Sequence, residues 1–174
     1  MKGSGTEDDP FLIKTYGDLK SIGYGKYKLS SIYRVVNDID ASVSKREARF
    51  SGRGTGFKPI GKIDIYEEYC DCSGVVLGGY TSQDTSRLFS GKLYGGGHSI
   101  NGLFMNYMDN EPKGFIDTIA TTGMVDSLSF KKYEFSTGES GLQHVGALAS
   151  VNMGSISYVD VDALLSNIYH GAGL

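Results

Sequence analysis

Side chains that could bind a metal gather in one short stretch of the sequence: Glu67, Glu68, Cys70, Asp71 and Cys72. Carboxylates of this kind bind calcium, whereas zinc would need a second Cys or His pair at matching spacing. The three histidines, His98, His144 and His170, are scattered along the chain. The pattern favours an ordinary solvated loop. Calcium is the alternative, and we expect no other cofactor.

Two other groups of residues could take part in catalysis. Asp38 and Asp40 would share one face of a strand, and glycosidases use paired carboxylates. However, the sequence Asn-Asp-Ile-Asp favours side chains that hydrogen-bond to turn backbone. His98 follows a run of three glycines, but a phosphate-binding loop would need a helix after that run, and the next residues read as a strand. We therefore predict no catalytic residue.

A basic stretch between residues 45 and 62 carries six cations and one acid, Glu47. It could attract an acidic glycan, a phosphate-rich polymer or a membrane surface, or it could simply keep an exposed loop soluble. Tyrosines just beyond it could stack on sugars. The candidate ligand contacts are therefore Arg46, Arg49, Arg53, Tyr66, Tyr69 and Tyr80.

The elements that would position these residues are short strands. Runs at 27–29, 32–36, 39, 88–93, 100–105, 115–119, 125–130, 145–148 and 156–161 are rich in β-branched and aromatic residues. A short helix is predicted at 18–22, with Thr15 as its N-cap. Glycines recur 32 residues apart at Gly114 and Gly146, and 31 apart at Gly123 and Gly154. A period near 30 residues predicts an all-β solenoid, a right-handed parallel β-helix with an N-terminal cap helix and five or six coils.

The predicted organisation is a single domain over 1–174. It comprises a cap at 1–26, an inserted loop at 62–87 and repeat coils at 88–174. Residues 169–174 read as the start of another coil without a polar cap. An uncapped end exposes strand edges. It therefore predicts a piece of a longer protein, or end-to-end self-association.

Several segments, taken in order, resemble a known family. They are residues 5–13, 18–19, 27–29, 37–40, 57–61 and 89–103, the last of which reads FSGKLYGGGHSINGL. They are similar to bacterial surface proteins with Gly-Leu-x-Gly (GLUG) repeats. The resemblance implies right-handed parallel β-helices in secreted, non-catalytic adhesin regions. The family's Gly-Gly-Leu-x-Gly pattern is altered here, because residues 145–150 read VGALAS.

Composition limits the functional classes. A net charge of −3 does not suit a nucleic-acid-binding protein, and no apolar run is long enough to insert into a membrane. We expect a non-catalytic secreted or cell-surface adhesion module whose leader is absent from this sequence. Its partner would be a glycan or a host or bacterial surface protein. The alternatives are a β-helical polysaccharide-degrading enzyme or phage tailspike segment, and a structural spacer or assembly unit.

Overall fold

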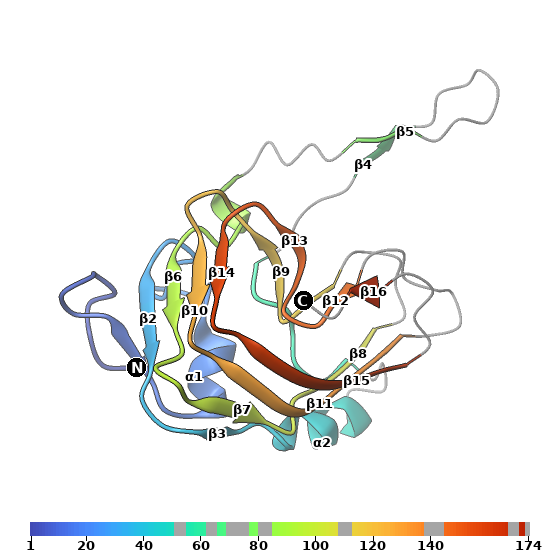
Figure 1. Ribbon diagram of the computed structural model, residues 1–174, viewed down its shortest axis with the longest axis horizontal. Coiled ribbons are helices and arrows are strands. Elements are labelled where there is room, and N and C mark those ends of the chain that lie inside the picture. Colours follow the sequence, from blue (N-terminus) through green and yellow to red (C-terminus); the bar gives the residue numbers. More distant parts are fainter. Residues whose placement is uncertain are drawn as a thin grey trace.

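Most of the regular secondary structure consists of short parallel strands (Figure 1). The computed structural model describes residues 1–50, 55–61, 66–68, 77–79, 85–107, 113–137, 145–166 and 171–172. One five-stranded sheet has the order β1 (Phe11–Ile13), β2 (Ile32–Val35), β6 (Lys92–Tyr94), β10 (Met124–Asp126), β14 (Ser155–Ser157). A second sheet has the order β15 (Asp160–Ser166), β11 (Ser129–Thr137), β7 (Ser99–Asn101), β3 (Ile39–Asp40), and β8 (Phe104–Tyr107) also pairs with β11.

Smaller elements complete the described residues. Two parallel pairs join β9 (Ile116–Ile119) to β13 (Ala149–Asn152) and β12 (Val145–Gly146) to β16 (Gly171–Ala172). The strands β4 (Tyr66–Glu68) and β5 (Leu77–Gly79) pair antiparallel and lie apart from the other sheets in Figure 1. The helices are α1 (Tyr16–Ser21), α2 (Val43–Phe50) and the single 3₁₀ turn η1 (Thr85–Arg87).

The prediction of a regular right-handed β-helix is wrong. The described strands form separate sheets, mostly parallel, with two short α-helices, and within the described residues they do not close into a solenoid. The reason lies in the spacing of neighbouring strands. Partner residues are 22 apart between β1 and β2, 60 apart between β2 and β6, and 32 and 31 apart across β10. The period read after residue 114 therefore does not extend to the first half of the chain.

The repeated glycines do lie on neighbouring segments. Met124 pairs with Ser155, which places Gly123 beside Gly154, and Ile116 pairs with Ala149. The glycine run before His98 connects β6 to β7, and Gly96 and Gly97 have positive φ. This segment is followed by a strand, as the sequence predicted. Residues 27–29 are not a strand, and the predicted runs at 125–130 and 156–161 each split at a turn.

Aromatic side chains form the centre of the core. Phe57 stacks on Phe115 with ring centroids 5.2 Å apart, and Phe115 meets Phe130 edge-on at 5.0 Å. The series continues through Tyr133 to Phe135. All five side chains are fully buried. Because Phe57 precedes β6, and Phe115 precedes β9, these contacts tie together segments that are distant in the chain.

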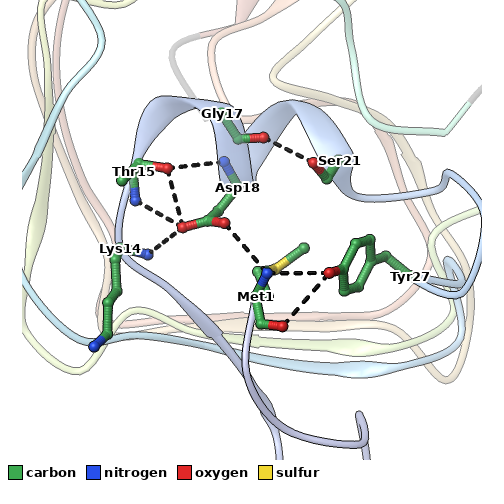
Figure 2. A network of polar contacts seen from close by, with 7 residues as sticks. All are labelled: Met1, Lys14, Thr15, Gly17, Asp18, Ser21 and Tyr27. Atoms are coloured by element: carbon green, nitrogen blue, oxygen red, sulfur yellow. Dashed lines mark hydrogen bonds and ion pairs between the residues drawn. The ribbon is translucent and has the colours of Figure 1, made fainter.

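Helix α1 has the predicted N-cap, with a capping box between Thr15 and Asp18, but it spans Tyr16–Ser21 and not 18–22. The Asp18 N–H donates to Thr15 Oγ1 at 3.2 Å, and Asp18 Oδ2 accepts the N–H groups of Lys14 and Thr15 at 2.9 and 3.0 Å. Figure 2 shows the Met1 ammonium group between Asp18 Oδ1 (3.5 Å) and Tyr27 Oη (3.0 Å). The network anchors residues on both sides of α1 at one carboxylate.

The stability of α1 should therefore depend on pH. Partial burial of Asp18 opposes its ionisation, but the hydrogen bonds from Lys14 and Thr15 outweigh this and lower the pKa of its carboxyl. A lowered folded-state pKa stabilises the protein above the unfolded value of about 3.9, and the gain is lost as the pH falls below it. We expect Asp18→Asn to cost about 1 kcal/mol at pH 6. Most of this difference should disappear near pH 2.5.

Urea unfolding at both pH values measures this effect. Asp8→Asn, at another exposed aspartate near the N-terminus, is the matched control. If Asp18→Asn lowers the free energy of unfolding by the same amount at pH 2.5 as at pH 6, the ionised Asp18 carboxylate does not stabilise α1.

The sequence predicts an exposed basic loop after residue 45, whereas the structure has helix α2 there. Ser44 fixes the helix: its Oγ donates to Ala41 O at 2.6 Å and accepts the Phe104 N–H at 2.8 Å. Lys45 then pairs with Glu134 of β11, with Nζ 2.6 Å from Oε2. These partners lie 60 and 89 residues away, so local sequence does not reveal them.

Candidate groove beside helix α1

Two adjoining cavities, of about 580 and 550 Å³, lie beside the C-terminal end of α1. They share Ile22, Tyr24, Thr55, Lys58 and Pro59, and we call them together the α1 groove. One wall is the turn that follows α1, and the other is segment 55–61. This segment is held in place by the Phe57 N–H, which donates to Phe104 O, and by the Ile60 N–H, which donates to Phe115 O, both at 2.9 Å. Each cavity is within the size range of small-ligand sites.

A cluster of polar side chains lies on the α2 side of the groove. Lys20 Nζ is 2.8 Å from Glu47 Oε1, and Tyr16 Oη donates to Glu47 Oε2 at 2.8 Å. Burial, followed by the hydrogen bond to Glu47, raises the pKa of Tyr16 well above its usual value. Burial of Glu47 opposes its ionisation, but the bonds from Lys20 and Tyr16 lower the pKa of its carboxyl. Glu47 is therefore a carboxylate that is already engaged by two donors.

The opposite side of the groove contains two buried charged residues. Lys113 is 4% exposed and Asp117 is 3% exposed, and both line the second cavity. The Lys113 ammonium lies 5.3 Å from the centroid of the Tyr107 ring, and Tyr107 Oη donates to Phe57 O at 3.0 Å. Buried charges are costly unless they are compensated. Both residues have partners within the protein, and they give this side of the groove a charged wall.

The rim of the groove is formed by Tyr24 and Lys58. Tyr24 is 62% exposed, although large aromatic side chains are usually buried. Lys58 is also exposed. Within the part of the chain that the structure describes, the Lys58 side chain makes no hydrogen bond or ion pair. An exposed aromatic ring beside a cation gives the groove one flat face and one positive charge.

Of the predicted contact residues, Arg46 does not line this groove. Arg46 is exposed on α2, and Arg49 lies on the same helix. Tyr66 lies on β4, while Arg53, Tyr69 and Tyr80 are outside the described residues. Of Lys45, Arg46 and Lys58, whose side chains the structure describes, Lys58 is the one that lines the groove.

Sequence reasoning missed Tyr24, Arg87, Lys113 and Asp117. The one available signal was Lys113 and Asp117 on either side of the repeat glycine Gly114, because charged residues seldom lie beside or within a buried strand. Nothing in the sequence connected these residues with Tyr24.

The other candidates for chemistry have structural roles. Asp38 Oδ1 accepts the Ser99 N–H at 2.8 Å, and this bond lowers the pKa of the Asp38 carboxyl. Asp40 Oδ1 accepts the Ser42 N–H at 2.9 Å, as the turn interpretation predicted. His98 Nδ1 lies 3.6 Å from Asp38 Oδ1.

The proposed calcium ligands are only partly covered by the structure. Glu67 and Glu68 lie on β4, whereas Asp71 and both cysteines are outside the described residues. In the described ranges, no three His, Cys, Asp or Glu residues form a group that could hold a metal ion. Among the same residues, no helix has the length and apolar character needed to cross a bilayer.

Two known proteins contain a region similar to nearly all of this chain. A Gly-rich membrane protein of Evansella cellulosilytica is 29% identical over 164 residues, which are 92% of this chain and 15% of that protein. Halomucin of Haloquadratum walsbyi is 27% identical over 157 residues, 90% of this chain and 1% of that protein. The chain thus spans a small part of the length of these relatives. No protein-family model and no solved structure matches it.

Proposed function

We propose that this chain is a non-catalytic module of a cell-surface protein and that it binds glycans in the α1 groove. One observation carries the surface assignment. The similar region covers nearly all of this chain, yet it is a small part of two much longer proteins, one named a membrane protein and the other Halomucin. A unit of this size within much longer chains suits a module that serves the larger protein. The resemblance to GLUG-repeat surface proteins points in the same direction.

The shape and chemistry of the groove support glycan binding. A sugar ring has apolar faces and a rim of hydroxyl groups. The groove combines the exposed Tyr24 ring and the apolar Ile22 and Pro59 with hydrogen-bonding groups such as Lys58 and Thr55. Binding sites of this kind use apolar surface for affinity and a few polar groups for orientation.

A second candidate function is end-to-end assembly. Strands β14 and β15 are the last strands of their sheets, and each has one unpaired edge within the described residues. Tyr158 is 87% exposed and Leu164 is 64% exposed at this edge. Exposed apolar edge strands favour pairing with another chain. At the other end of the first sheet, Lys2 pairs with Leu12 of β1, so we expect copies to associate through the edges of β14 and β15 as a dimer.

A glycan-array screen together with sedimentation velocity separates the two functions. The intact chain is compared with a variant whose residues 62–84 are replaced by a short Gly-Ser linker, which leaves η1 and its Arg87 in place. We expect both proteins to bind the same glycans, because the groove is retained. If the variant without residues 62–84 no longer binds glycans, the binding site lies in that segment and not in the α1 groove. No binding, together with dimerisation that depends on concentration, would favour assembly.

A further inference from the structure

We propose that the α1 groove selects acidic saccharides, those whose sugar rings carry anionic groups. The inference rests on the proposed glycan binding and defines its ligand class. Among the residues that the structure describes, six charged side chains line the two cavities, four cations and two acids: Lys20, Lys58, Arg87, Lys113, Glu47 and Asp117. The chain as a whole has a formal charge of −3. The excess of positive charge is therefore a local property of the groove.

The acids of the groove are already engaged by groups of the protein. Glu47 accepts hydrogen bonds from Lys20 and Tyr16. Asp117 Oδ1 lies 3.4 Å from the backbone N–H of Gly114, which donates to it. The negative charges of Glu47 and Asp117 are therefore partly neutralised by these donors before a ligand enters. An anionic ligand meets less repulsion here than the count of acids suggests.

Lys58 is the cation best placed to meet such a ligand. It lines both cavities, and its side chain is exposed. Because it has no ion-pair partner among the described residues, a ligand would not have to displace one. A hydrogen bond between two charged groups is worth more than a neutral one. Lys58 therefore supplies selectivity for an acidic group.

Tyr24 would hold the sugar ring that carries the anionic group. It lines both cavities together with Lys58, and its ring is more than half exposed. Its backbone is held by the Tyr24 N–H, which donates to Ser21 O at 3.1 Å, and by Tyr24 O, which accepts the Tyr27 N–H at 3.0 Å. The ring is thus presented by an ordered turn, which reduces the entropy lost on binding.

Titration calorimetry with two matched probes tests the proposal. Tetragalacturonic acid carries a carboxylate on each ring, and its methyl ester has the same rings without the charge. We expect the acid to bind the intact chain about tenfold more tightly than the ester, and the preference to shrink as salt is added. Lys58→Glu should abolish the preference. Tyr24→Ala should weaken both probes about equally.

Lys131→Glu is the charge-matched control, because Lys131 is exposed on β11 and does not line the groove. It should leave the affinity for both probes unchanged. Circular dichroism checks that each variant is folded. We expect that result because the two substituted rim residues, Tyr24 and Lys58, are exposed.

The remaining outcomes overturn different parts of the proposal. Equal binding of acid and ester, or neutral glycans bound on the array while the acid is not, would refute acid selectivity and leave glycan binding intact. A preference that Lys58→Glu leaves unchanged, together with affinities that Tyr24→Ala leaves unchanged, would refute the groove as the site. If no glycan binds in either the array or the calorimetry, glycan binding by this chain is refuted.

Discussion

Replacing Phe115 by alanine is expected to lower the free energy of unfolding by about 4 kcal/mol. Phe115 is fully buried, and it contacts Phe57 on one side and Phe130 on the other. The substitution removes the ring that joins segment 55–61 to β11. Partial collapse of the cavity would recover little, because both neighbours are themselves fixed by backbone hydrogen bonds or strand pairing.

Urea denaturation followed by circular dichroism measures this loss. Tyr24→Ala is the aromatic control at an exposed position, and its free energy of unfolding should change by less than about 1 kcal/mol. A cost for Phe115→Ala as small as that of Tyr24→Ala would mean that the aromatic series does not hold the sheets together.

Replacing Gly123 by alanine should destabilise the protein by about 3 kcal/mol. A Cβ at this position would overlap the carbonyl oxygen of Phe89 and lie 2.8 Å from Ile119 Cγ2. The backbone at Gly123 also takes part in the strand stack, since its carbonyl accepts the Ser155 N–H at 3.0 Å. Relief of the overlap would therefore require a shift of main chain on two neighbouring segments.

Gly17→Ala is the matched control and should have the opposite sign. Gly17 lies within α1, and the nearest atom to an added Cβ is Thr15 Oγ1 at 3.7 Å. Alanine favours a helix over glycine, so this variant should gain about 0.5–1 kcal/mol. Thermal melts of both variants compare them directly. A Gly123→Ala protein that melts at the wild-type temperature would disprove the close approach.

The sequence predicted the features that depend on short stretches of chain. Thr15 and Asp18 are three residues apart, so their capping box was visible before the structure was known. The glycine period after residue 114 indicated neighbouring segments, and the structure pairs those segments in parallel, with partners 31 and 33 residues apart. The period could not be extended to the first half, because 60 residues separate the partners in β2 and β6.

Residue types and spacing by themselves determined the N-cap of α1, the glycine turn before His98 and which segments of the second half repeat. These features follow from backbone conformation and from contacts that recur at a fixed interval. Only the tertiary structure decided that the strands form separate sheets, that the basic stretch contains α2, and that Tyr24, Lys58 and Lys113 meet at one groove. Burial of the aromatic core brings those three segments together, and that packing depends on contacts between residues far apart in the chain.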